Sequence, residues 1–171
     1  VPVPTFYHLP ISCNTEGTKL SKRDFGFSLD DLNKAGFLPE AICNYLAVIG
    51  GSFKQELMDF NELAQALHFD TSSPAGTIRY DAEKLRWFNH KWINRLSLEE
   101  LVARTMPFLQ EQFPQANHDP KLKELIAKIQ PDMVTLHDAV EMLSFYFTHP
   151  QPTAEVLEHH QAARCMPIIA A

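Results

Sequence analysis

The chain has 171 residues, 45% of them apolar, and its 15 Lys and Arg against 21 Asp and Glu leave a formal net charge of −6. This length suits one large domain or two small ones, and twelve Phe with two Trp exclude a disordered tail. No apolar run approaches the roughly 20 residues that a membrane helix needs. The negative charge argues against general polyanion binding, but it allows a local basic face.

The first ten residues, VPVPTFYHLP, contain neither a Met nor the basic and apolar regions of a signal peptide. We therefore expect the sequence to begin inside a longer protein. The three cysteines, Cys13, Cys43 and Cys165, form no CxxC pair, which favours reduced thiols in the cytoplasm. The eight histidines show no metal-ligand spacing, so we expect no metal site.

The sequence pattern predicts a mostly α-helical fold, with one possible strand at residues 6–11. Helix-capping residues and helix-starting prolines recur along it, and two glycine positions, Gly36 and Gly50, are expected to end helices. Helix starts are predicted at Ser28, Pro39, Asp59, Asp81, Ser97, Pro120, Thr135 and Thr153.

The segment at residues 17–23 (GTKLSKR) carries the clearest chemistry. It brings Lys19, Lys22 and Arg23 together on a short loop, which Gly17 allows to bend and which Leu20 can anchor in the core. Such a loop suits a phosphate that gains charge in a transition state, because Lys supplies a point charge and Arg a fork of donors. The alternative from residue types alone is a solvated basic turn.

This segment resembles the KMSKS loop of class I aminoacyl-tRNA synthetases, in the KLSKR form typical of glutamyl-tRNA synthetases. Two later segments resemble the same family in the same order. Residues 33–52 (NKAGFLPEAICNYLAVIGGS) are similar to its GYLPEALLNYLALLGWS form, and residues 80–89 (YDAEKLRWFN) to its FDxEKLxWxN helix. The similarity is good over residues 5–110 and weaker beyond.

The resemblance implies an ATP-dependent ligase that activates glutamate, with ATP and Mg as substrate, and transfers it to tRNA(Glu). In such enzymes the lysine matching Lys22 lies against the ATP phosphates, while those matching Lys19, Leu20, Ser21 and Arg23 form the rest of the ATP-binding loop. The family's His-x-Gly-His signature is absent from the chain. We therefore expect the nucleotide-binding fold to lie upstream of Val1, and the 171 residues alone to be inactive.

The resemblance also implies a domain organisation. Residues 1–95 would hold the end of the catalytic core, with its loop and a short strand, and an α-helical stem-contact domain. Residues 96–171 would form an α-helical anticodon-binding domain, which we expect to be incomplete in this chain. We expect a cytoplasmic monomer without membrane contact. The alternative is a non-catalytic module, derived from a synthetase, that binds tRNA or another protein.

Basic residues cluster between Arg79 and Arg95, a segment with five basic and two acidic residues. Residues 96–171, in contrast, contain five basic and ten acidic residues. Helical spacing spreads the cluster over more than one face, so two or three of its members are expected to reach RNA. The alternative is a solvated set of charges. The predicted RNA-contacting residues are Lys84, Arg86, Lys91 and Arg95.

Three further residues of the predicted helices, Trp87, Trp92 and Asn44, admit two roles each. Trp87 and Trp92 are five apart, so each is either a core residue or a ring that stacks on an RNA base. Asn44 and Tyr45 lie in an otherwise apolar helix. A buried Asn that caps a neighbouring carbonyl is favoured over a sugar contact.

Overall fold

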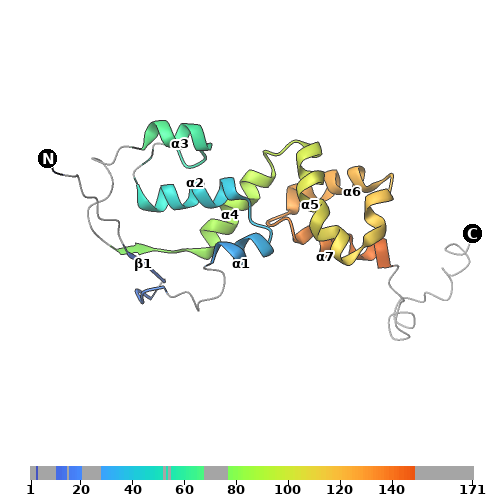
Figure 1. The fold of residues 1–171 in the computed structure, drawn as a ribbon, viewed down its shortest axis with the longest axis horizontal. Helices are drawn as coiled ribbons and strands as arrows, with labels where there is room; N and C mark the ends of the chain where they lie inside the picture. Colours follow the sequence, from blue (N-terminus) through green and yellow to red (C-terminus); the bar gives the residue numbers. More distant parts are fainter. Residues whose placement is uncertain are drawn as a thin grey trace, which may run out of the picture.

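A computed structural model gives the fold, which is mostly helical as the sequence predicts (Figure 1). Within the part of the chain that it describes, no helix is both long and apolar enough to cross a membrane. The described residues are 3, 11–14, 16–20, 28–51, 53, 55–67 and 77–148.

Two short strands, seven α-helices and two 3-10 helices make up the described chain. In order they are β1 (Ile11–Cys13), α1 (Leu29–Lys34), α2 (Pro39–Gly50), α3 (Phe60–Ala66), β2 (Thr77–Arg79), α4 (Ala82–Ile93), α5 (Leu98–Gln112), η2 (Pro114–His118), α6 (Leu122–Ile129), η3 (Gln130–Asp132) and α7 (Asp138–Thr148).

Four predicted helix caps are confirmed. The side chains of Ser28, Asp59, Asp81 and Ser97 each accept a hydrogen bond from the backbone N–H three residues on, at 2.8–3.3 Å. At Asp59 and Ser97 the third residue is a Glu whose carboxylate also accepts from the cap's own N–H. These caps satisfy N–H groups that have no partner within the helix, which is why the helices begin at these residues.

Two predicted helix starts differ from the structure, and two other predicted elements lie mostly or wholly outside the described residues. The helix expected from Pro120 begins at Leu122, after Asp119 Oδ1 accepts from Lys121 N at 2.7 Å. At the start of α7 the capping roles are reversed, because the Asp138 carboxylate accepts from Thr135 N and from Thr135 Oγ1. The cap expected at Thr153 and most of the strand expected at residues 6–11 lie outside the described residues.

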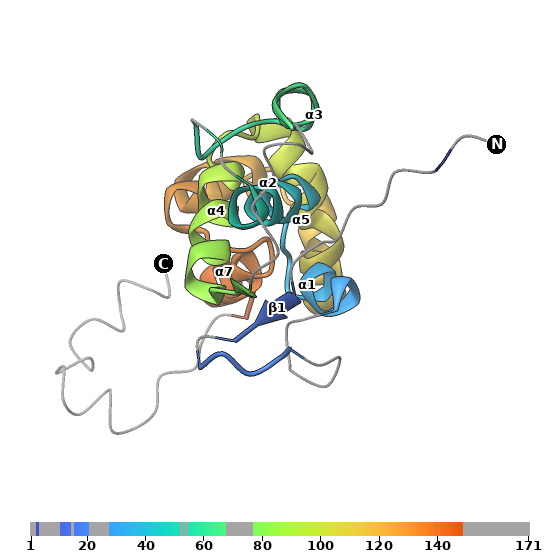
Figure 2. The ribbon, with the colours of Figure 1, turned by 90° about the vertical axis from the view of Figure 1, so that its left-hand side faces the viewer.

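The first half of the described chain, residues 11–96, places two strands beside a layer of helices (Figure 2). β1 and β2 pair in parallel, with Ile11 opposite Thr77 and Cys13 opposite Arg79. α2 packs extensively on α4 and also contacts α3. Because parallel strands need a long crossover, the helices between β1 and β2 follow directly from this pairing.

The second half, residues 97–148, is a helical bundle in which α5 packs against α6 and α7. Figure 1 shows this bundle at the end of the molecule away from the sheet. One hydrophobic core runs through both halves, from Leu32 in α1 to Leu143 in α7. The two halves therefore share a continuous buried surface.

A bidentate ion pair also links the halves. Arg104 on α5 donates to the Glu40 carboxylate on α2, with Nη1 to Oε2 at 3.0 Å and Nη2 to Oε1 at 2.8 Å. The Arg104 hydrogen bond, opposed by partial burial, holds the pKa of Glu40 below its usual value of 4.5. A carboxyl group whose pKa is lowered by folding contributes stability above its unfolded pKa, and this contribution is lost as the pH falls through the folded pKa.

We therefore expect Glu40→Gln to lower the free energy of unfolding at neutral pH by about 1 kcal/mol, since the pair is only partly buried. The difference in the free energy of unfolding between the variant and the parent protein should shrink below pH 4.5, where Glu40 of the unfolded parent is mostly protonated. Urea unfolding at several pH values measures this. Glu124→Gln, which breaks the exposed pair with Lys128, is the control and should change stability less. A difference that stayed constant down to strongly acidic pH would contradict the assignment.

Candidate nucleic-acid interface

The first part of the loop at residues 17–23 lies antiparallel to β1. Leu20 N donates to Ser12 O at 3.1 Å, and Lys19 pairs with Cys13 in an antiparallel bridge. Gly17 makes the turn with φ +85°, as its predicted bending role requires. Lys19 is exposed and Leu20 is half-buried. Ser21, Lys22 and Arg23 lie outside the described residues, so their roles stay predictions.

Asn14 organises this turn, a role that the sequence analysis missed. Its Oδ1 accepts from Glu16 N at 3.1 Å and from Thr18 N at 2.8 Å, while its backbone carbonyl accepts from Gly17 N at 3.0 Å. An Asn side chain that accepts from the backbone two residues on is a standard turn former. The signal was present as an Asn three residues before a Gly.

The four predicted RNA-contacting residues lie on α4 and just after it. Lys84 and Lys91 are seven residues apart, so they share one side of the helix at 100° per residue. Arg95 follows in the turn after Ile93, the last residue of α4. Arg86 lies on roughly the opposite side from Lys84 and lines a separate pocket. The contact of these residues with RNA stays a prediction.

The three clustered cations have contacts that hold them near the surface of α4. Lys84 Nζ lies 3.5 Å from Glu56 Oε1. Lys91 Nζ lies 5.7 Å from the centre of the Trp87 ring, and the Arg95 guanidinium lies 5.3 Å from that of Trp92. A cation that lies over an aromatic face keeps its positive charge, so it can still bind an anion that approaches from the solvent side. We call Lys84, Trp87, Lys91 and Arg95 the α4 surface.

The two tryptophans have different environments. Trp92 is 8% exposed, and its Nε1 donates to Asn44 Oδ1 at 3.1 Å, so its predicted core role is confirmed. Trp87 is 39% exposed and packs edge-on against Phe88. An exposed ring beside cations is the arrangement that stacking on a nucleic-acid base requires. For Trp87 the stacking alternative therefore remains.

Asn44 is fully buried and supports the α4 surface from beneath. Its Nδ2 donates to Glu56 O at 2.9 Å, and its Oδ1 accepts from Met58 N at 3.2 Å. The predicted capping of a neighbouring carbonyl is confirmed. Since the same segment carries the Glu56 carboxylate that pairs with Lys84, Asn44 links the core to the surface charges.

Tyr45, the next residue on α2, fixes the beginning of α4. Its buried hydroxyl oxygen accepts from Asp81 N at 2.7 Å. Burial is the main cause that raises the Tyr45 pKa to about 12. The hydroxyl therefore stays protonated in neutral solution, and it acts as a structural partner rather than as an acid or base.

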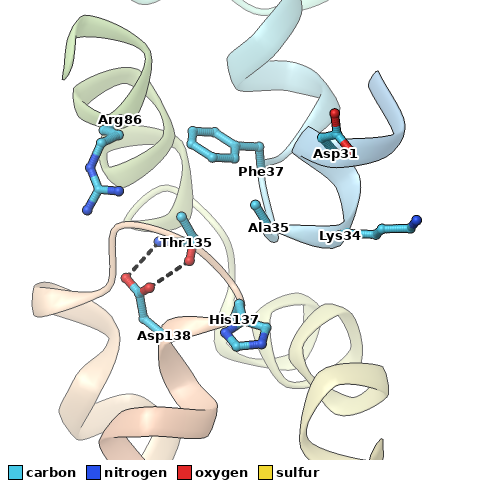
Figure 3. A pocket seen from close by; sticks show the side chains of 8 residues that line it. All are labelled: Asp31, Lys34, Ala35, Phe37, Arg86, Thr135, His137 and Asp138. Carbon is cyan, nitrogen blue, oxygen red and sulfur yellow. Dashed lines mark hydrogen bonds between the residues drawn. The ribbon is translucent and has the colours of Figure 1, made fainter. Parts of the chain in front are cut away.

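A pocket of about 390 Å³ lies on the other side of α4, between α1 and the start of α7 (Figure 3). Arg86 extends toward the segment that holds Thr135 and Asp138, while Lys34 points away from it. Two cations and two carboxylates nearly balance, so the pocket does not favour a polyanion. Arg86 thus stands apart from Lys84, Lys91 and Arg95, and its predicted contact with RNA stays a prediction. The pocket is lined by Asp31, Lys34, Ala35, Phe37, Arg86, Thr135, His137 and Asp138.

Metal-ligating side chains do not gather in the described ranges. There, no group of three or more His, Cys, Asp or Glu is arranged to bind a metal ion. The two cysteines in these ranges, buried Cys13 and exposed Cys43, are free thiols.

Comparison with known proteins supports the resemblance to class I tRNA synthetases. Residues 1–87, about half of the chain, match the family model described as tRNA synthetases class I (E and Q), catalytic domain. The chain belongs to this family. The match includes the loop at residues 17–23, the helix α2 and the first part of α4.

Curated relatives of this class I family member are named glutamate--tRNA ligase. The protein from Thermus thermophilus is 38% identical over 155 residues, which cover 89% of this chain and 33% of the relative. The protein from Crocosphaera subtropica is 38% identical over 145 residues, which cover 81% of this chain and 30% of the relative. The chain thus spans about a third of the length of the curated relatives it matches.

Solved structures of class I synthetases have the same fold as this chain. A glutamate tRNA ligase from Elizabethkingia meningosepticum, crystallised with its amino acid, superposes with a TM-score of 0.73 at 26% identity. A glutamate-tRNA synthetase from Elizabethkingia anophelis gives a TM-score of 0.75 at 26% identity. These matches cover 92% and 93% of this chain and 35% and 36% of the solved chains.

Proposed function

We propose that the protein is a glutamate–tRNA ligase, in which this chain supplies the ATP-contacting loop and helices that bind tRNA(Glu). The relatives named glutamate--tRNA ligase match 81–89% of the chain, which supports this assignment. In this proposal residues 1–95 hold the end of the catalytic core and the stem-contact domain. Residues 96–171 begin the anticodon-binding domain, and the protein works as a cytoplasmic monomer.

The chemistry proceeds in two transfers. A carboxylate oxygen of glutamate attacks the α-phosphorus of ATP, and the bond to pyrophosphate breaks, which leaves glutamyl adenylate. A hydroxyl of tRNA then attacks the activated carbonyl carbon, and AMP leaves. Negative charge gathers on the phosphates in the first step, so a fixed cation there lowers the barrier. We assign this role to Lys22, with Lys19, Leu20, Ser21 and Arg23 forming the loop around it.

The observation that carries the tRNA-binding part is the α4 surface. Two of its three cations, Lys84 and Lys91, lie on one side of α4, and Arg95 lies in the turn after it, in a chain whose net charge is −6. A local cluster of this kind attracts phosphates although the whole chain is acidic. The exposed ring of Trp87 beside Lys91 adds a platform for a base or ribose.

The triple variant Lys84→Gln, Lys91→Gln and Arg95→Gln tests this part. We expect it to weaken binding of tRNA(Glu) by about tenfold or more, and to reduce the slope of log affinity against log salt by about 0.7–0.9 for each phosphate that the variant no longer neutralises. Fluorescence anisotropy with labelled tRNA at several salt concentrations measures both quantities.

A triple variant with the same change in charge serves as the matched control. Lys121→Gln, Lys123→Gln and Lys128→Gln removes three cations at exposed positions at or in α6. It should leave the salt slope nearly unchanged. Equal losses of tRNA affinity in both variants would contradict the assignment of the α4 surface as the binding site. No measurable tRNA binding by the parent chain would instead favour the protein-interaction alternative.

A further inference from the structure

The two halves share one hydrophobic core, and the hydrogen bonds between them are made mainly at backbone segments. The extensive helix contacts described above lie within each half, α2 on α4 in the first and α5 on α6 and α7 in the second. Besides the Arg104–Glu40 pair, the hydrogen bonds that cross between the halves within the described ranges involve three segments. We call residues 35–38, 89–96 and 130–137 together the joint.

Asn89 lies at the centre of the joint and is fully buried. Its Oδ1 accepts from Leu38 N at 2.7 Å, a bond within the first half. Its Nδ2 donates across the joint to Val134 O at 2.6 Å and lies 3.5 Å from Gly36 O. One side-chain amide therefore holds the turn between α1 and α2, the middle of α4 and the segment before α7.

The backbone at Gly36 comes equally close to the second half. Gly36 O accepts from Leu136 N at 2.9 Å. A Cβ on Gly36 would lie 2.6 Å from His137 N and 2.8 Å from Leu136 N, and its φ is +81°. This contact leaves no room for a side chain, so the two backbone segments are fixed against each other.

Two further side chains tie the end of α4 to the same segment of the second half. Gln130 Nε2 donates to Ile93 O at 3.0 Å and to Leu96 O at 3.1 Å. His90 Nδ1 lies 2.9 Å from Met133 O, which makes Nδ1 the protonated ring nitrogen. The bond to Leu96 O satisfies a carbonyl just beyond the helix end, while Ile93 O also accepts from Leu96 N at 3.2 Å.

We propose that Asn89 is a positioning residue, which sets the angle between α4 and the bundle and thereby the direction in which an RNA held on the α4 surface meets the second half. The link to RNA rests on the proposed function, whereas the geometric role does not. Loss of the amide leaves buried Leu38 N and half-buried Val134 O without this partner, and the cost of that state favours movement of the halves apart.

The chain itself provides a matched control for Asn89. Asn44 is also fully buried and also makes three hydrogen bonds, but all its partners, at residues 56, 58 and 92, lie in the first half. Asn89→Ser and Asn44→Ser remove the same group from equally buried positions. A merely structural loss would appear in both variants, whereas a change in the angle should appear only for Asn89.

The distance between spin labels on α4 and α7 reports the angle directly. The labels are attached at Glu83→Cys and Glu141→Cys, both exposed, in the 171-residue chain with Cys43 and Cys165 changed to serine. Pulsed electron paramagnetic resonance should give a distance distribution at least about twice as wide for Asn89→Ser as for the parent, and an unchanged one for Asn44→Ser. Equal distributions for Asn89→Ser and the parent, or equal broadening in the two variants, would overturn the proposal.

A milder variant covers the case in which Asn89→Ser does not fold. Gln130→Met removes two bonds across the joint from a half-buried position, and it should broaden the same distribution to a smaller extent. An unbroadened distribution for this variant would also overturn the proposal. Titration with tRNA(Glu) is a separate arm, in which weaker binding by both Asn89→Ser and Gln130→Met than by the parent supports the link to RNA. Broadening without any tRNA binding by the parent would refute the proposed function and leave the joint standing.

Discussion

Under the proposed function, Lys22→Ala in the full-length protein is expected to slow the formation of glutamyl adenylate by a factor of about 100 to 1,000. This corresponds to about 3–4 kcal/mol, the scale observed when one preorganised donor to a developing charge is removed. The reason is that Lys22, in the proposed mechanism, faces the ATP phosphates while they gain negative charge. Exchange of labelled pyrophosphate into ATP in the presence of glutamate and tRNA(Glu) measures this step.

The affinity for tRNA distinguishes this role from a general electrostatic one. Lys22→Ala should bind tRNA(Glu) within about twofold of the parent, because the proposed RNA contacts lie on the α4 surface. Lys128→Ala, which removes an exposed cation from α6, is the control and should leave both pyrophosphate exchange and tRNA binding nearly unchanged. A Lys22→Ala protein with normal adenylate formation and weakened tRNA binding would show that the loop serves RNA instead of ATP.

Gly36→Ala is expected to lower the free energy of unfolding by about 3 kcal/mol or more, because two costs combine at this position. A residue with a Cβ pays about 1 kcal/mol or more for a positive φ, and the added Cβ overlaps backbone nitrogen atoms that no side-chain rotation can move. Relief of the overlap requires Leu136 and His137 to withdraw, which breaks the bond from Leu136 N to Gly36 O. Urea unfolding followed by circular dichroism measures the loss.

Gly17→Ala is the matched control, because Gly17 has nearly the same φ, +85°, but a Cβ there would meet no atom within 4 Å. It should pay only the conformational cost, on the order of 1 kcal/mol. The difference between the two variants therefore isolates the close approach of the two halves at Gly36. Similar losses in both variants would mean that the backbone segments of the joint separate at little cost.

The helix starts were predictable because they depend on neighbours in the sequence. Ser28, Asp59, Asp81 and Ser97 cap helices through groups only three residues away, so residue type and spacing suffice. The start of α7 was less accurate. There Asp138 accepts from Val134 N as well as Thr135 N, and a carboxylate with several nearby donors competes with the simple cap.

The spacing of Lys84 and Lys91 on one side of α4, the bend at Gly17 and the family resemblance were all determined by the sequence alone, because each depends on local geometry or on residue order. Only the tertiary structure decided that Trp87 is exposed while Trp92 is buried, and that Arg86 faces a different pocket. It also decided that Asn89, the last residue of the YDAEKLRWFN segment, forms hydrogen bonds with Leu38, which lies 51 positions earlier, and with Val134, which lies 45 positions later. Burial and hydrogen bonds of this kind depend on which distant segments pack together. The periodicity of one helix predicts which of its faces is buried, but it does not identify the segment that packs on that face.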